Sequence, residues 1–78
     1  MADVVLPELA KDVNQAVVSF WHFELGEHVK EGDDLVEMMT DKATFNVPSP
    51  VSGELIKTMA EEGQEVKVGQ PIATIKEA

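Results

Sequence analysis

Apolar residues in this chain occur in short runs rather than in long periodic stretches. Val, Ile, Phe and Thr recur in groups closed by Gly, Pro, Asn or Asp, a pattern typical of β-strands separated by turns. No window has the helical apolar period. Pro7, Asp12 and Asn14 favour turns, so residues 8–15 are predicted to be a loop. Strands are predicted at residues 3–6, 16–23, 35–39, 44–47, 53–58 and 71–76, with shorter extended segments around Val29 and Val66.

An internal repeat indicates how these strands are arranged. Residues 26–32 (GEHVKEG) resemble residues 63–69 (GQEVKVG) at an offset of 37, and the same offset relates Leu35 to Ile72. Two similar halves predict that each half supplies strands to one shared core. The predicted fold class is therefore all-β: a flattened barrel or sandwich of two antiparallel sheets, each of about four short strands, with pseudo-two-fold symmetry.

The repeat also predicts where one lysine lies. The first half does not stop at its last repeat position but continues through residues 40–43 into a new strand. Lys42 is therefore expected in the tight connection between the two halves. Asp41 suits a turn, because its short side chain can bond nearby backbone N–H groups. Pro48 and Pro50 predict that the following strand is an edge strand or bends.

Length and charge narrow the class of protein. The chain has 78 residues, enough for one domain, and its lack of cysteine leaves neither disulfides nor thiolate zinc sites. Its 15 acidic residues outweigh six lysines, giving a formal charge of −9. Nucleic acid and anionic membranes are therefore poor partners, whereas a basic protein surface fits, unless the acidity serves only solubility. Residues 1–25 lack a signal-peptide pattern and no apolar stretch is long enough for a membrane span, so a soluble chain is expected.

The residues around Lys42 carry a family resemblance. Asp41-Lys42-Ala43, flanked by residues 35–37 and 47–53, resembles the lipoyl domains of 2-oxo acid dehydrogenase acyltransferase (E2) subunits. Glycines stand ten residues before and eleven residues after the lysine, at Gly32 and Gly53. The resemblance extends over nearly the whole chain, from residue 4 to residue 75. The three residues at the tip alone are weak evidence for the family. Together with the spacing of the two glycines and the internal repeat, they are specific for it.

This resemblance implies a covalent cofactor and its chemistry. Lys42 would carry lipoic acid in amide linkage, attached by a lipoate ligase or lipoyl transferase, and the net charge would change from −9 to −10. A thiamine-dependent decarboxylase (E1) would acylate the lipoyl group, the E2 core would transfer the acyl group to coenzyme A, and dihydrolipoamide dehydrogenase (E3) would reoxidise the dithiol. The domain itself would then be a carrier and not an enzyme, although its parent would be an acyltransferase.

The same resemblance implies where the domain lies in its parent protein and in the cell. Residues 1–78 would be a single lipoyl domain from the N-terminus of a longer E2 chain, monomeric when isolated. Lys42 would stand at one end of the domain and both termini at the other. The parent would be cytoplasmic in a bacterium or archaeon, or in the mitochondrial matrix of a eukaryote.

Recognition residues are expected beside the lysine. Asp41 and Ala43 are either recognised by the enzyme that attaches the cofactor or are simply good turn formers. Glu37, Met39 and Thr40 are candidates for partner recognition. Many lipoyl domains have Glu where this chain has Met39, and residues 6–12 also depart from the family pattern. Both departures leave the 2-oxo acid open, and the loop at 6–12 is expected to lie near the lysine hairpin.

The other chemically notable side chains are expected to be structural. His22 and His28 have no third metal ligand at a recognisable spacing. The pair Asp33-Asp34 fits a solvated turn. Core or half-buried positions in strands are expected for the aromatic side chains Phe20, Trp21 and Phe23, and packing positions for Met38, Met39 and Met59.

Three alternative functions remain open at this stage. A biotinyl carrier domain would share the repeat and the hairpin lysine, but such domains typically show Met-Lys-Met where this chain has Asp41-Lys42-Ala43. The lipoylated carrier of glycine cleavage resembles a longer chain with flanking helices. An adaptor of the same fold that only binds proteins would keep its lysine free in a cell that lipoylates other proteins.

Overall fold

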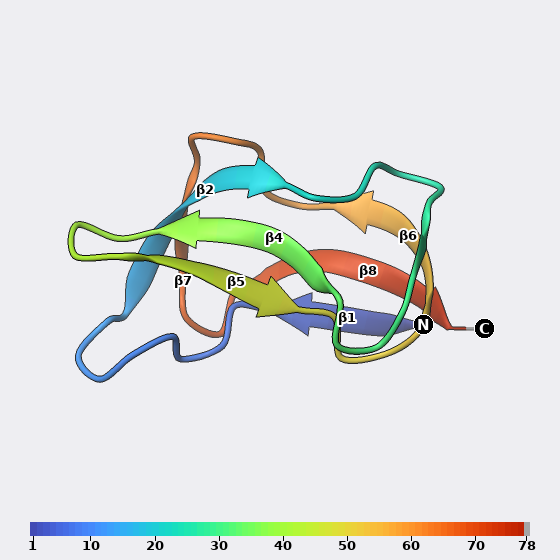
Figure 1. The fold of residues 1–78 in the computed structure, drawn as a ribbon, viewed down its shortest axis with the longest axis horizontal. Helices are drawn as coiled ribbons and strands as arrows, with labels where there is room; N and C mark the ends of the chain where they lie inside the picture. The colour runs from blue at the N-terminus through green and yellow to red at the C-terminus, as the bar shows by residue number, and fades with distance from the viewer. Residues whose placement is uncertain (78) are drawn as a thin grey trace.

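Eight β-strands are present in residues 1–77, the part of the chain that the computed structural model describes (Figure 1). They are β1 Ala2–Val5, β2 Gln15–Trp21, β3 His28–Val29, β4 Asp34–Met39, β5 Thr44–Pro48, β6 Gly53–Thr58, β7 Glu65–Lys67 and β8 Pro71–Glu77. Each predicted strand is confirmed to within two residues at either end. The same 77 residues contain no helix, and so none that could cross a membrane.

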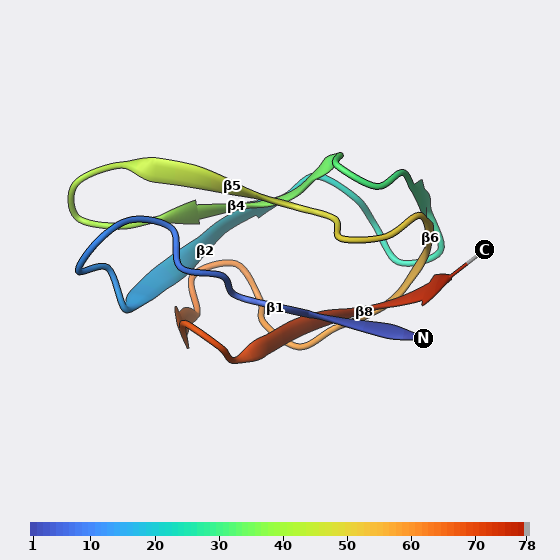
Figure 2. The same cartoon turned by 90° about the horizontal axis from the view of Figure 1, so that it is seen from below.

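The strands form two antiparallel sheets that lie one above the other (Figure 2). One sheet has the order β5-β4-β2-β7 and is called the hairpin sheet below, because β4 and β5 form a long hairpin. The other has the order β1-β8-β6-β3 and contains both terminal strands; it is called the terminal sheet. This flattened sandwich confirms the predicted fold class.

A single hydrophobic core fills the space between the sheets. Alternate residues of a strand point to opposite faces, so the strands contribute roughly every second side chain to this core. In β4 and β8 two consecutive residues, Leu35-Val36 and Ile72-Ala73, are both buried. Half-buried Trp21 and Phe23 pack against its margin. Burial of these apolar side chains is the main source of stability in a chain that has no disulfide. The buried hydrophobic residues are Val4, Leu6, Ala16, Val18, Val29, Leu35, Val36, Met38, Val47, Leu55, Ala60, Val66, Ile72, Ala73 and Ile75.

Backbone hydrogen bonds repeat at the offset of 37 residues. The amide of Gly26 donates to the carbonyl of Leu55 (2.8 Å), and the amide of Gly63 donates to the carbonyl of Val18 (2.7 Å). Both glycines have φ near +90°, a conformation that side-chain-bearing residues rarely adopt. The predicted repeat is therefore confirmed as pseudo-two-fold symmetry of the backbone.

The same offset relates two irregularities in the sheets. The pairing of β2 with β4 shifts its register between Val18 and Phe20, and that of β6 with β8 shifts between Leu55 and Lys57. Each shift inserts one extra residue into a strand, which is a β-bulge. The two sheets thus share pairing and bulge position as well as strand order.

The β4–β5 hairpin and the chain termini lie at opposite ends of the molecule (Figure 1). The Met1 amino group and the Glu77 carboxylate are 4.0 Å apart where β1 and β8 lie side by side. The hairpin tip projects from the other end, as predicted for Lys42.

Candidate functional site: the lysine hairpin

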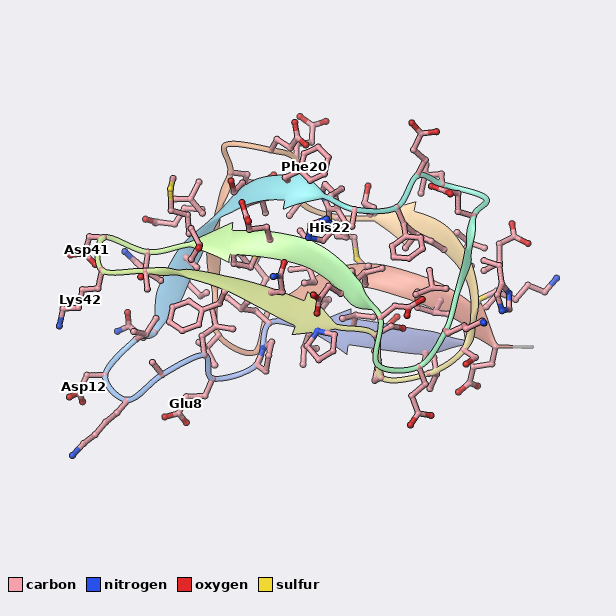
Figure 3. All side chains as sticks on the ribbon, in the orientation of Figure 1. Glu8, Asp12, Phe20, His22, Asp41 and Lys42 are labelled. Carbon is pink, nitrogen blue, oxygen red and sulfur yellow. The ribbon has the colours of Figure 1, made fainter. Side chains whose placement is uncertain are left out.

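The candidate site is the tip of the β4–β5 hairpin. Met39 and Thr44 form the last residue pair of the two strands. The amide of Thr40 then donates to the carbonyl of Ala43 at 2.8 Å and closes the connection. Lys42 is exposed at the tip, and its side chain extends away from the sheets (Figure 3). Asp41 and Ala43 are exposed on either side of it.

The hydroxyl of Thr40 organises this tip. Its Oγ1 accepts hydrogen bonds from the amides of Ala43 (3.1 Å) and Lys42 (3.3 Å) and donates to the Ala43 carbonyl (3.0 Å). The prediction that Asp41 would bond the turn backbone is wrong, because the residue just before the turn supplies that oxygen and Asp41 faces solvent. Threonine before a tight connection is a known turn signal, so Thr40 could have been recognised as a structural residue of the tip.

The loop between β1 and β2 lies beside the hairpin, as predicted. Asp12 on this loop is found at the same end of the molecule as Lys42 (Figure 3). It is the one non-glycine residue with positive φ (66°) among residues 1–77. A crevice of about 260 Å³ separates loop from hairpin and is lined by Asp12, Val13, Asn14, Gln15, Thr40, Asp41 and Lys42.

This loop is longer than its symmetry-related counterpart. Leu6 and Ser49 make equivalent backbone hydrogen bonds and are 43 residues apart in the sequence. Farther along the chain, Ala16 and Gly53 occupy equivalent positions in the strand pairing and are 37 residues apart. The segment from Leu6 to Ala16 is therefore six residues longer than its counterpart from Ser49 to Gly53. All the additional chain lies at the end of the molecule that bears Lys42 (Figure 1).

The surroundings of Lys42 suit an anchor rather than a catalytic base. The one ion pair within residues 1–77 joins Met1 and Glu77, so the Lys42 amine has no carboxylate partner there. No group of three residues able to hold a metal occurs in that part of the chain either. An exposed amine on a projecting hairpin can be reached by an enzyme that acylates it.

The partner-recognition candidates on β4 lie on the outer face of the hairpin sheet. Glu37 is half-buried between the β2 and β5 neighbours Phe20 and Asn46. Met39 is 45% exposed at the end of the strand. The prediction that Met39 is a packing residue is therefore wrong, because it stands on the solvent side of the sheet. Met38 is fully buried, as predicted.

The bulge at Ser19 overturns one prediction about the aromatic residues. Phe20 is 53% exposed, although it was expected in the core or half-buried. The extra residue in β2 reverses the alternation of side chains, so Phe20 turns outward while Trp21 and Phe23 turn toward the core. Trp21 is half-buried as expected, and its Nε1 donates to the Ala60 carbonyl at 2.9 Å.

The two histidines lie in different places. His28 is exposed in β3 of the terminal sheet. His22 follows β2 and forms a hydrogen bond between its Nε2 and the Asn46 Oδ1 at 2.8 Å. The Phe20 ring packs edge-on against it, with centroids 5.4 Å apart (Figure 3). This exposed Phe20–His22–Asn46 cluster was not anticipated from the sequence.

Comparisons with known proteins agree with this geometry. A model of the biotin/lipoyl family, described as "Biotin-requiring enzyme", matches residues 2–75. The acetyltransferase component of the pyruvate dehydrogenase complex of Acholeplasma laidlawii is 39% identical over 75 residues, 96% of this chain and 14% of that protein. The succinyltransferase component of the 2-oxoglutarate dehydrogenase complex of Bartonella vinsonii subsp. berkhoffii is 39% identical over 74 residues, 95% of this chain and 18% of that protein.

A solved structure is similar over its whole length. It is the lipoyl domain of the 2-oxoglutarate dehydrogenase complex from Azotobacter vinelandii, with a TM-score of 0.76 and 26% identity. The match covers 97% of this chain and 96% of that one. The chain thus spans a small part of the acyltransferase components and nearly all of an isolated lipoyl domain.

Proposed function

This chain belongs to the biotin/lipoyl family as a lipoyl domain, and we propose that Lys42 is the residue that carries its lipoic acid. The observation that carries this assignment is the position of Lys42, exposed at the tip of the hairpin that projects farthest from the termini (Figure 3). As a carrier, the domain is a substrate of other enzymes and contributes no catalytic group of its own.

The residues at the tip fit the group. Amide formation needs a free amine that an enzyme can enclose, and the Lys42 amine is exposed without an ion-pair partner in the described structure. Three of the other lysines, Lys57, Lys67 and Lys76, are also exposed but lie within strands rather than at the tip of a hairpin. The hydrogen bonds of Thr40 hold the tip in one conformation, so the ligase meets a preformed turn.

The chain's own task is to present the arm away from its surface. When bound, the lipoyl group supplies a disulfide ring that can accept and release an acyl group together with two electrons. The hairpin holds the attachment point at the end opposite the termini, so the arm can enter partner active sites while the chain stays tethered (Figure 1).

The partners follow from the relatives. We propose that the chain is the carrier segment of a longer acyltransferase, because it matches 14% and 18% of two such components. Its partners would be a 2-oxo acid decarboxylase, the acyltransferase core, dihydrolipoamide dehydrogenase and a lipoate ligase, in the cytoplasm or mitochondrial matrix. The isolated domain would be monomeric. Both pyruvate and 2-oxoglutarate complexes occur among the relatives, so the 2-oxo acid is a matter for assay.

Mass spectrometry tests the assignment. The chain is co-expressed with a lipoate ligase and lipoate, and its intact mass and peptide map are measured. One lipoyl group on Lys42 is expected in the parent, and none in the correctly folded Lys42→Arg variant. A Lys57→Arg control should be lipoylated fully. Lipoylation of the Lys42→Arg variant would contradict the proposal. Modification of the parent by a biotin ligase in place of the lipoate ligase would show that the chain is a biotinyl carrier.

A further inference from the structure

A groove lies beside the lysine hairpin on the outer face of the hairpin sheet. Met39, Val17 and Glu65 pair directly across β4, β2 and β7, so their side chains form one row on the same face. Met39 is 45% exposed and Val17 is half-buried, which leaves apolar surface open to solvent. The groove, called the hairpin groove below, has a volume of about 500 Å³, which is in the range of sites that hold small molecules. It is lined by Gln15, Ala16, Val17, Met39, Thr40, Asp41 and Glu65.

The hairpin groove is continuous with the crevice that contains Lys42. That crevice, between the β1–β2 loop and the hairpin, is lined in part by Gln15, Thr40 and Asp41, and the same three residues line the groove. One depression therefore runs from Lys42 past the start of β2 to Val17. Asp41 and Lys42 stand at its outer end (Figure 3). A group attached to the Lys42 amine is thus held at the mouth of the depression.

The polarity of this depression changes along its length. The part that contains Lys42 has polar side chains, including those of Asp12 and Asn14. The far part has the apolar side chains of Val17 and Met39. A lipoyl group in amide linkage to a lysine has the same order, because the polar amide comes first and the methylene chain and dithiolane ring follow. Polar walls therefore meet the amide, and apolar walls meet the chain and the ring.

Acylation changes what the Lys42 side chain prefers. The free side chain ends in a charged ammonium group, and it extends away from the sheets into solvent (Figure 3). Acylation converts the ammonium group into a neutral amide and adds an apolar tail, so the reason to stay in water is removed. The tail remains tethered beside the depression at an effective concentration on the order of millimolar. A weak contact is therefore sufficient to hold the arm in the groove.

We propose that the lipoyl arm on Lys42 folds back along this depression between visits to its partners, with its dithiolane ring against Val17 and Met39 in the hairpin groove. This inference rests on the proposed function, because Lys42 must carry the group. The groove shields the disulfide from small thiols in solution, which reduce a disulfide only where they can reach one of its sulfur atoms. The arm leaves the groove when a partner's active site binds it more tightly, so resting and presentation alternate.

Paired variants test this resting site through a reaction that needs no partner enzyme. Val17→Thr/Met39→Gln makes the groove polar without adding charge, and Val5→Thr/Phe20→Gln makes the same kinds of change at exposed residues outside the groove. Each lipoylated chain is reduced with dithiothreitol, and the loss of dithiolane absorbance is followed. We expect the reduction rate of Val17→Thr/Met39→Gln to exceed that of the parent about threefold or more, and that of the control pair to stay within about 1.5-fold.

A second measurement uses the parent chain and so does not depend on the folding of a variant. Amide chemical shifts are compared between the lipoylated and the unmodified isotope-labelled chain. Asp41 is beside the attachment point and changes in any case, so the informative signals are those of Val17 and Glu65 on the strands farther from the tip. They should change on lipoylation, whereas those of His28 and Glu54 on the terminal sheet should not.

Failure of the proposed function and failure of the resting site give different results. An intact mass without a lipoyl group on Lys42 would refute the function. The groove is then tested by titrating lipoamide into the unmodified chain: a saturable change at Val17 and Glu65 would support it as a site for the lipoyl group, and no change would overturn it.

With Lys42 lipoylated, three results would overturn the resting site. The first is an unchanged reduction rate in Val17→Thr/Met39→Gln, and the second is an equal rise in the control pair. The third is an absence of chemical-shift change at Val17 and Glu65 on lipoylation.

Discussion

The hairpin sheet and the terminal sheet repeat one another in strand order, pairing and bulge position, yet they differ at one end of the molecule. In the hairpin sheet, β4 turns at Lys42 into β5, whereas the equivalent strand of the terminal sheet, β8, extends to Glu77 beside the N-terminus. The segment from Leu6 to Ala16 that leads into β2 is also six residues longer than its counterpart from Ser49 to Gly53. The features that distinguish the two sheets thus gather around the lysine.

The inward-facing positions of the two sheets, by contrast, are similar in character. Val18 and Leu55 correspond, as do Met38 and Ile75, and all four are buried. Packing between the sheets requires apolar side chains at both members of each pair, so these positions stay similar in character. Differences at outward positions are free of that requirement, and they are where function can differ between the sheets.

The largest effect on stability is expected at Gly53, which lacks the space for a side chain that the equivalent position of the other sheet has. A Cβ added at Gly53 would collide with the backbone carbonyl of Lys76, whereas the equivalent Ala16 already has a Cβ in its place. Gly53→Ala should lower the free energy of unfolding by about 2 to 3 kcal/mol. The matched Ala16→Gly should lower it by about 1 kcal/mol. Urea unfolding measures both, and equal losses would show that the sheets do not differ in this way.

A smaller effect is expected at the hairpin tip. Thr40→Val keeps the shape of the side chain and removes the hydroxyl that bonds Ala43 and Lys42. The free energy of unfolding should fall by about 1 kcal/mol, and lipoylation should slow because the turn is less ordered. Thr40→Ser retains the hydroxyl and should behave as the parent in a ligase time course. Parent-like rates for Thr40→Val would show that the Thr40 hydroxyl has no role in lipoylation.

The smallest effect concerns the longer connection of the hairpin sheet. Asp12 has φ of 66°, which Asp tolerates better than Ala and which Gly adopts freely. Asp12→Ala should lower the free energy of unfolding by about 0.5 to 1 kcal/mol, and Asp12→Gly should change it by less than about 0.5 kcal/mol. Thermal unfolding of the two variants compares them. A greater loss in Asp12→Gly would mean that the Asp12 side chain, rather than its backbone, holds the loop.

Much of the fold could be predicted because two signals agreed. The runs of β-formers located the strands, and the repeat at offset 37 indicated two equivalent halves, which placed Lys42 in the connection between them. The position of the loop beside the hairpin followed from the family resemblance. These features depend on local sequence and on chain length between turns, both of which are visible in one sequence.

The errors at Phe20, Met39 and Asp41 have physical causes. A β-bulge reverses the alternation after Ser19, and an alternating pattern alone does not reveal it. The repeat did contain a signal, since Phe20 corresponds to Lys57, a residue that must face solvent. At the tip, both Thr40 and Asp41 could have bonded the turn, and only the geometry shows that the threonine hydroxyl does so.

We propose that position at the hairpin tip, and not the lysine alone, selects the site of lipoylation. The most direct measurement uses the variant Asp41→Lys/Lys42→Asp, which exchanges the two tip residues and keeps composition and net charge unchanged. After co-expression with a lipoate ligase and lipoate, the intact mass of this variant is compared with that of the parent. We expect one lipoyl group on the parent and none on the exchanged variant, with the same circular dichroism spectrum for both. Full lipoylation of the relocated lysine would contradict it.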